Sequence, residues 1–231
     1  LNPANQFIIP KGKFFGGFEV QLTETFLDDP NAFKICYVVP VRITDSSLDS
    51  ILSGKSPIAN PDPRIAGNWN IPPKNFSLFG IKYINKYHGK YMHRGISIRK
   101  NLSLVPQDTV IYRTKYIESN EIWALKTTGR YKVTVTGVVR SKPGSPGSFI
   151  MDLTFDANDN CTITTSTGSA FPVTGTGKFI KDGDEWGNKK RNAIQLSYDI
   201  TQGAINIFSV KDTLVIRDRD VRYEDFVPVV Y

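Results

Sequence analysis

The sequence predicts an all-β protein whose larger, C-terminal part folds as a meandering antiparallel barrel or sandwich. Turn signals recur about every ten residues, and the segments between them are short and rich in β-branched and aromatic residues. Strands do not alternate with long amphipathic helices, which disfavours parallel α/β folds. The chain of 231 residues, 40% hydrophobic and 22% charged, has an ordinary globular composition. No apolar run reaches the ~20 residues that span a bilayer.

The first part of the chain holds three apolar segments with strand character. They are "FIIP" at 7–10, "GFEVQLTE" at 17–24 and "ICYVVPVRIT" at 35–44, while "TFLDDPNAFK" at 25–34 indicates a crossover with one helical turn. Three or four strands with one apolar face cannot close a sandwich alone. We therefore expect a second sheet, supplied by a preceding N-terminal segment or by another chain. It would cover the apolar side chains Phe7, Ile9, Phe18, Val20, Leu22, Val39 and Val41.

Composition places a linker between two domains. The stretch "SGKSPIANPDPRIAGNWNIPPK" is dense in Pro, Gly, Asn and Ser. The predicted division is a partial sandwich at 1–60, a linker at 61–75 and a barrel at 76–231. Cys36 and Cys161 fall in different domains, so we expect two small buried thiols and no disulfide framework.

Turn residues divide the second part into short strands. Because reversing turns separate them, the strands should form an up-and-down antiparallel meander of about eight to ten strands. The expected strands are 78–85, 87–99, 110–118, 121–128, 131–139, 149–156, 160–166, 172–181, 191–200 and 211–218, with a last piece at 225–230.

"YINKYHGKYMHRG", residues 83–95, holds both histidines of the chain. In a strand His88 and His93, five residues apart, point to opposite faces and cannot share a metal ion. The segment is typical of a strongly bent barrel strand. "FDANDNCTI" begins like a calcium loop at Asp156, but Cys161 replaces the required glycine and the terminal glutamate is missing. We expect a hairpin there, and neither a metal nor another cofactor.

The net charge of +7 is concentrated in one block. Residues 71–140 carry 13 Lys+Arg against 3 Asp+Glu, a net of +10, whereas 1–70 and 141–231 are slightly acidic. Such a block attracts phosphates, sulfates or an anionic membrane surface. The cations are spaced along strands, and no helix-turn-helix, zinc-finger or RNA-recognition signature is present. Nucleic acid is therefore not expected as a partner.

Catalytic chemistry finds little support in the sequence. Serine hydrolases of the common type need a nucleophile elbow, which is absent. A glycoside hydrolase needs only two carboxylates about 5–9 Å apart. Two acidic groups could supply them, Asp182 with Asp184 and Glu185, and Asp218 with Asp220. The simpler interpretation of each group is a solvated turn, so no catalytic residue is assigned.

The stretch "KDGDEWGNKKR", residues 181–191, is the strongest candidate for ligand binding, because it is a polar loop with one tryptophan. Sugars stack their C–H faces on aromatic rings and bind polar side chains at the rim. Counting loops along an up-and-down meander places the end of the strand at 87–99 beside this loop, and the positive charge there admits an acidic glycan. The candidate ligand-binding residues are Trp186, Asn188, Lys189, Arg99 and Lys100. A Trp186 that simply caps the barrel is the alternative.

Several segments resemble a known group of proteins. They are "GGFEVQLTETFLDDPNAFKICYVVPVRITDSSLDSILSGKSP", "YINKYHGKYMHRG" and "VIRDRDV", of which the last two are the most specific. The chain resembles Bacteroidetes surface lipoproteins of unassigned function, whose genes often lie in polysaccharide-utilisation loci. Their first domain is an immunoglobulin-like module, also found ahead of family-18 endoglycosidases, and their second is a lipocalin-like barrel.

The resemblance implies an all-β fold, with a partial immunoglobulin-like β-sandwich followed by an antiparallel lipocalin-like β-barrel. It also implies export and an outer-membrane or cell-surface location through a lipid anchor that is absent from this sequence. It supplies no catalytic residues.

The leading hypothesis is non-catalytic glycan binding at the cell surface, in support of polysaccharide capture. The alternatives are a carbohydrate-active enzyme that uses an Asp/Glu pair, and an adhesion or assembly module without a small ligand. A cleft with two converging carboxylates would favour the enzyme, and an aromatic platform beside polar rims would favour binding. A filled barrel without a cleft would favour the structural module.

Overall fold

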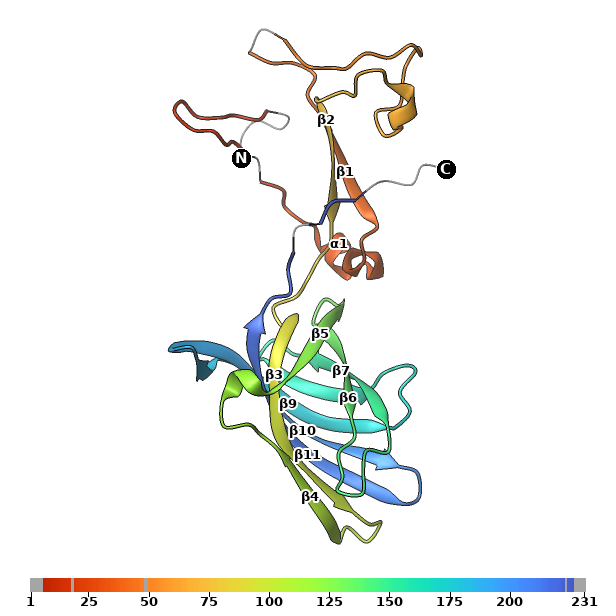
Figure 1. Ribbon diagram of the computed structural model, residues 1–231, viewed down its shortest axis with the longest axis vertical. Helices are drawn as coiled ribbons and strands as arrows, with labels where there is room; N and C mark the ends of the chain where they lie inside the picture. Colours follow the sequence, from red (N-terminus) through yellow and green to blue (C-terminus); the bar gives the residue numbers. More distant parts are fainter. Residues whose placement is uncertain (1–5, 18, 48–49, 223, 227–231) are drawn as a thin grey trace.

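The computed structural model describes residues 6–17, 19–47, 50–222 and 224–226. A small N-terminal part stands at one end of a closed β-barrel (Figure 1). The described chain is therefore an all-β protein, as predicted. Within these ranges no helix is both long and apolar enough to cross a membrane.

The N-terminal part holds two short helical turns whose starts are capped by side chains. α1 (Glu24–Asp28) follows Thr23, whose hydroxyl accepts a backbone N–H of the first turn. η1 (Pro30–Phe33) follows Asp29, whose carboxylate does the same. Proline suits the first helical position because its missing N–H needs no partner. The two turns confirm the helical crossover expected at 25–34.

A two-stranded antiparallel sheet joins β1 (Tyr37–Arg42) to β2 (Phe76–Ile81). The segment between them contains η2 (Ala66–Asn68). The expected start of the barrel at residue 76 is thereby corrected, because β2 pairs across the linker with β1 and not with a barrel strand. The barrel begins at β3 (Gly89–Lys100).

The described residues do not form the expected sandwich. The segments 7–10 and 19–22 contain no strand, and Phe18 lies outside the described residues. Apolar side chains of this part are exposed, among them Phe7, Ile9, Val20, Leu22 and Val39. A sheet or chain that covers them stays a prediction.

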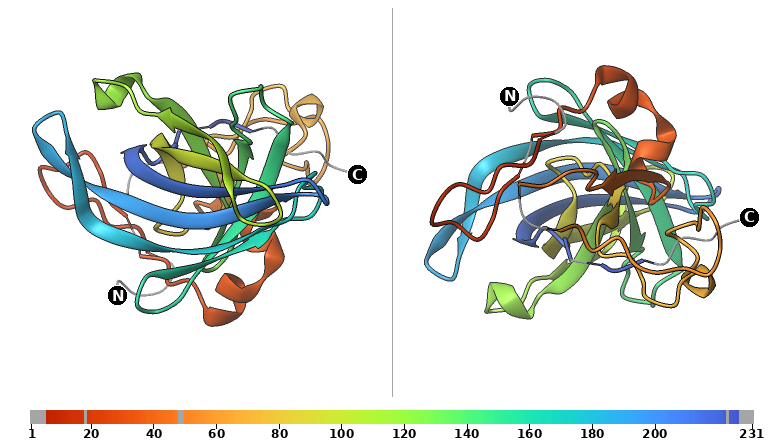
Figure 2. Two further views of the ribbon diagram at one scale, coloured as in Figure 1. Left: turned by 90° about the horizontal axis from the view of Figure 1, so that it is seen from below. Right: turned by 90° about the horizontal axis from the view of Figure 1, so that it is seen from above.

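The barrel is a closed ring of eight antiparallel strands with a further strand at its edge (Figures 1 and 2). Around the ring the order is β3, β5, β6, β7, β8, β9, β10 and β11, and β11 pairs again with β3. The remaining bounds are β4 (Pro106–Tyr112), β5 (Glu121–Gly129), β6 (Lys132–Val138), β7 (Ser148–Phe155), β8 (Asn160–Thr165), β9 (Val173–Trp186), β10 (Lys189–Gln202) and β11 (Asn206–Asp218). The last strand expected, at 225–230, falls mostly outside the described residues.

β4 and β5 run in the same direction, each antiparallel to β3. β4 pairs with residues 95–100 of β3 and β5 with residues 89–93. The chain between them, which contains η3 (Ile117–Ser119), therefore leaves the wall and returns without reversing. The expectation of a reversing turn at 118–120 is wrong, and every later loop lies at the end of the barrel opposite to the one expected from loop counting.

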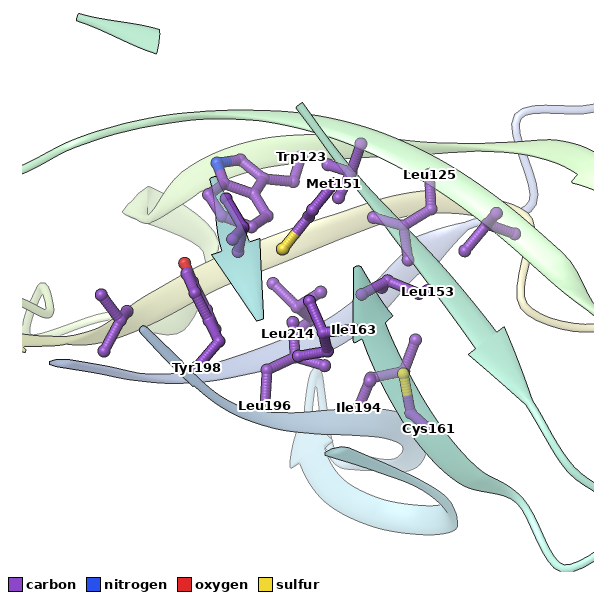
Figure 3. Close-up of a cluster of buried hydrophobic side chains, with 14 of the residues drawn as sticks. Trp123, Leu125, Met151, Leu153, Cys161, Ile163, Ile194, Leu196, Tyr198 and Leu214 are labelled. Atoms are coloured by element: carbon purple, nitrogen blue, oxygen red, sulfur yellow. The ribbon is translucent and has the colours of Figure 1, made fainter. Parts of the chain in front are cut away.

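The barrel interior is filled by side chains from all eight ring strands. Figure 3 shows part of this core, with Trp123, Met151 and Leu196 among the labelled residues. Gly177 is required for close packing, since a Cβ there would lie 2.7 Å from Leu196 Cδ2. Burial of this apolar surface is the main stabilising contribution to the barrel. A ligand site must therefore lie on the wall or at an end.

The two cysteines are free, and only one lies where we expected it. Cys161 belongs to the barrel core, whereas Cys36 is exposed because it follows η1 in the thin N-terminal part. The segment that begins like a calcium loop is the β7–β8 hairpin, as predicted. Asp156 Oδ1 accepts the backbone N–H groups of Asn158 and Asn160, both at 2.8 Å.

Candidate functional site

Two adjoining hollows lie on the side of the barrel around β4. The outer hollow, about 560 Å³ in volume, lies on the outer wall over β4, β3, β11, β10 and β9. The fork hollow, about 490 Å³, lies where β4 and β5 separate at β3. Ile111 and Arg113 line both hollows, so one ligand chain of sufficient length would contact both.

The strand register arranges the floor of the outer hollow in two rows. Alternate residues of each strand point outward, and neighbouring strands are about 4.8 Å apart. The first row is Thr176, Ser197, Lys211, Ile96 and Ile111. The second row is Lys178, Gln195 and Thr213, and it continues to Arg94 at the rim of the hollow. Hydroxyl, amide and ammonium groups thus stand side by side on a surface open to solvent.

Positive charge predominates on this floor. Lys178, Lys211 and Arg113 form no ion pair with any residue in the part of the chain that the structure describes. Arg94 is paired with Asp184. The Asp212 side chain, although it is next to Lys211, is fully buried because it points into the barrel.

The β9–β10 hairpin, whose tip projects beyond the barrel wall, borders this region (Figures 1 and 2). A register shift between Arg191 and Ala193 bends it. Trp186 Nε1 donates to the carbonyl oxygen of Ile216 at 3.0 Å, and the Arg191 guanidinium lies 4.4 Å from the indole centroid. Trp186 is therefore half-buried between the barrel wall and a cation.

The polar wall of the fork hollow is formed by Tyr112, Glu121 and Arg140, with His93 behind them. Arg140 pairs with Glu121 and its guanidinium lies 4.6 Å from the Tyr112 ring centroid. Glu121 is 43% exposed, so its carboxylate is the acidic group of this hollow that a ligand can reach.

His93 links two carboxylates inside the wall. Its Nδ1 lies 3.2 Å from Glu121 Oε2, and its Nε2 lies 3.0 Å from Asp212 Oδ2 at an angle that departs from a linear hydrogen bond. The imidazole stacks on Trp123 with centroids 3.7 Å apart. Burial lowers the pKa of His93, but the contacts with Asp212 and Glu121 outweigh it, so the pKa lies above its ordinary value. The hydrogen bond with His93 lowers the pKa of Glu121. The arrangement fits an imidazolium between two carboxylates.

Asp212 is held by two tyrosines as well as by His93. The Tyr112 hydroxyl and the Tyr198 hydroxyl, the latter at 2.7 Å, donate to its carboxylate. Burial and the charge of Asp212 raise the pKa of both tyrosines, which therefore act as neutral donors. Gly95 makes room for the group, since a Cβ there would lie 2.0 Å from Asp212 Oδ1. The buried carboxylate is well satisfied, which is the condition for a stable buried charge.

The five residues predicted to bind a ligand are divided between the two ends of the barrel. Arg99 and Lys100 lie opposite Phe208 and Ile207 at one end, where Arg99 pairs with Asp108. The second group, Trp186, Asn188 and Lys189, lies at the tip of the β9–β10 hairpin toward the other end. The expectation of a shared end is thus wrong, because the chain does not reverse between β4 and β5.

The predicted polar loop at 181–191 is mostly strand. β9 and β10 extend to Trp186 and Lys189, so the connection is a two-residue turn of Gly187 (φ 59°) and Asn188 (φ 57°). Positive φ at both central residues matches the right-handed twist of a hairpin. Asn188 therefore serves turn geometry.

Three of the five acidic residues weighed as catalytic pairs are engaged with cations. Asp184 pairs with Arg94, Asp220 with Lys90 at 2.6 Å, and Asp218 with Arg217 at 3.3 Å. Asp182 and Glu185 lie along the hairpin, exposed to solvent.

Sequence reasoning assigned no role to the cluster of His93, Glu121, Asp212 and Arg140, although two signals were present. The first is that His93 shares one strand face with Tyr91 and Gly95, and the structure buries both His93 and Tyr91. Asp212 stands in phase with Val210 and Leu214, which places a carboxylate on an apolar face. Glu121 and Arg140 come together because β5 and β6 form an antiparallel hairpin, which brings the start of β5 beside the residues that follow β6.

Known proteins resemble this chain over most of its length. A family model described as a domain of unknown function, DUF5627, matches residues 86–220, which contain the barrel. A solved structure of unknown function from Bacteroides ovatus is 34% identical, with a TM-score of 0.81 over 94% of this chain and 69% of that chain. No protein of curated function matches. The neighbour agrees with the expected resemblance to Bacteroidetes proteins of unassigned function.

Proposed function

The chain belongs to the DUF5627 family, and we propose that its barrel binds a glycan on the outer wall without catalysing a reaction. The observation that carries the proposal is the floor of the outer hollow. There Thr176, Ser197, Gln195 and Thr213 present hydroxyl and amide groups in register across three strands. Sugars offer donors and acceptors at a similar density, and these side chains both donate and accept.

The shape of the molecule supports a polymeric ligand. Side chains of the described ring strands fill the barrel interior, where lipocalin-like barrels enclose their ligands, so the wall is the better place for a ligand here. The two hollows are open and share Ile111 and Arg113, so a chain of several sugars fits them better than a compact molecule. This changes the predicted location of binding from the barrel mouth to the wall.

The setting that we propose for this activity is the cell surface. The resemblance to surface lipoproteins of polysaccharide-utilisation loci supports export, a lipid anchor and a role in polysaccharide capture. An immunoglobulin-like module completed outside the described residues belongs to the same proposal. Protease treatment of intact cells, which digests surface proteins alone, tests the location.

A carbohydrate-active enzyme is the second candidate, because Glu121 and Asp212 converge on His93. Two features weaken it. Asp212 has no exposed side-chain surface, and its oxygens are occupied by two tyrosines and His93. A carboxylate so enclosed cannot reach a glycosidic bond.

The binding proposal is tested by filling the hollow. Ser197 is exposed in the middle of the first row, so Ser197→Trp would place an indole on the floor with little effect on folding. We expect binding to the best ligand of a panel of neutral and acidic polysaccharides to fall at least tenfold, measured by calorimetry.

The matched control is Thr136→Trp, at an exposed position of β6, three strands from β9 and outside the linings of both hollows, which should bind like the wild type. Unchanged binding by Ser197→Trp would move the site elsewhere. A wild-type protein that binds nothing in the panel would reject the function.

A further inference from the structure

We propose that the ligand of the outer hollow is an acidic glycan, whose carboxylate or sulfate groups are bound by Lys178, Lys211 and Arg113. This inference rests on the proposed glycan binding and specifies its substrate class. It comes from the distribution of charge around the hollow. Neither the net charge of +7 nor the basic block at 71–140 indicates where on the barrel these three cations lie. Lys178 and Lys211 belong to the part of the sequence that is slightly acidic as a whole.

The three cations are spread over the width of the hollow. Lys178 lies on β9, Lys211 on β11 two strands away, and Arg113 at the far side next to β4. Two strands correspond to roughly 10 Å. Between the cations stand Ser197, Gln195 and Thr213, which are neutral. Charged groups separated by hydroxyl and amide groups match an extended polysaccharide that carries negative charges at intervals.

Among the described residues, no carboxylate near the hollow forms an ion pair with these three cations. Asp184 at the rim is paired with Arg94, and Asp212 faces the interior. Asp199 lies one row beyond the floor, opposite Thr174 and Ser209. Hydrogen bonds from Asn160 lower the pKa of Asp156 at the β7–β8 turn, and the charge of Lys178 adds to this effect. No acidic side chain is therefore directed onto the floor among the described residues.

Each exposed cation alone contributes little, because water and salt screen it. Three cations in one concave surface act together, since such a shape concentrates the electrostatic potential. Binding should therefore depend strongly on ionic strength, with a Debye length of about 10 Å at 0.1 M salt. It should also depend on the location of the cations and not only on their number.

The experiment compares two triple variants that remove the same total charge. The hollow variant is Lys178→Gln, Lys211→Gln and Arg113→Gln. The control variant is Lys34→Gln, Lys126→Gln and Lys142→Gln, at exposed lysines outside both hollows. The probes are polygalacturonate with its fully methyl-esterified form, and dextran sulfate with dextran. Each pair shares a backbone and differs in charge, and the two pairs distinguish carboxylate from sulfate.

We expect the wild type to bind at least one anionic probe, and to bind its uncharged counterpart at least tenfold more weakly. The hollow variant should lose at least tenfold in affinity and the control variant less than twofold. Equal losses in both variants would mean nonspecific attraction and would overturn the inference, as would failure of every anionic probe.

The outcome also separates this inference from the proposed function. One outcome would keep glycan binding and reject the acidic class. In it, a neutral polysaccharide binds the wild type, Ser197→Trp abolishes that binding, and the hollow variant retains it. If no polysaccharide binds, both are rejected.

Discussion

At the scale of single residues, the described chain gathers charged side chains around the buried His93 and Asp212. Two carboxylates, one imidazole and one guanidinium lie in contact between the core and the fork hollow. Burying a charge is unfavourable unless it is paired and hydrogen-bonded, and here Glu121 and Asp212 both have cationic partners or hydroxyl donors. The cluster fixes where β3, β5 and β11 meet, and so the position of the fork hollow.

The pKa shifts of the two histidines have opposite signs and predict opposite contributions to stability. The pKa of His93 is raised, so its contribution is full below the unfolded value of about 6.5 and is lost as pH rises through the folded value. The pKa of His88 is lowered, first by burial, so its contribution is full above about 6.5 and is lost as pH falls through its folded value.

We therefore predict that replacing His93 changes the pH dependence of unfolding. As pH rises above 6.5 the wild type should lose free energy of unfolding, by at most about 1.4 kcal/mol per pH unit for one proton. His93→Gln should remove this decline, whereas His88→Gln should leave it in place. Urea unfolding followed by circular dichroism at several pH values measures it. A decline of equal slope in wild type and His93→Gln would show that another group causes it.

At the scale of elements, the bounds of the strands β5 to β8 are predictable from sequence to within one residue. Local pattern determines them, because polar turns separate short alternating segments. The pairing of β2 with β1 was missed because it joins residues far apart in the chain. The continuation of β9 and β10 to Trp186 and Lys189 was missed because charged residues there are typical of a loop, whereas their side chains lie on an exposed hairpin.

The direction of β4 and β5 decided the accuracy of the site prediction. The sequence predicts both strands but also predicts that the chain reverses between them. One such error moves every later loop to the opposite end of the barrel. Backbone hydrogen bonds show the reason: Ser119 and Asn120 donate back to Tyr116 and Ile117, which closes a helical turn in place of a hairpin.

The hairpin gives a prediction at this scale. Since Trp186 covers the outer wall and donates to Ile216, Trp186→Ala should destabilise the protein by about 2 kcal/mol, or roughly 4–8 °C in Tm. Glycan affinity should change less than threefold, because the ring is not on the floor of the hollow. Scanning calorimetry and binding calorimetry test the two effects. Lost affinity with unchanged Tm would restore Trp186 as the ligand platform.

At the scale of the whole molecule, few contacts join the N-terminal part to the barrel. Arg130 pairs with Glu24 at 2.5 Å, and the Tyr83 N–H donates to the Ala32 carbonyl at 2.7 Å. By contrast, the segment just before β3 is held by the barrel, since Asn85 Nδ2 donates to the carbonyls of Gly129 and Lys132. Arg219 donates to the Asn85 carbonyl at 2.7 Å. The structural boundary therefore lies near residue 83.

This boundary predicts that residues 83–222 fold alone. An exposed ion pair contributes about 0–1 kcal/mol and one backbone hydrogen bond about 1 kcal/mol, so the isolated barrel should melt less than about 10 °C below the whole chain. Residues 1–82 should show no cooperative transition, because a two-stranded sheet buries too little apolar surface to be stable by itself. Calorimetry on the three proteins decides the matter. If 83–222 does not melt cooperatively, the N-terminal part belongs to the fold of the barrel. If 1–82 melts cooperatively, its exposed apolar side chains need no cover, and the expectation of a completing sheet or chain falls with it.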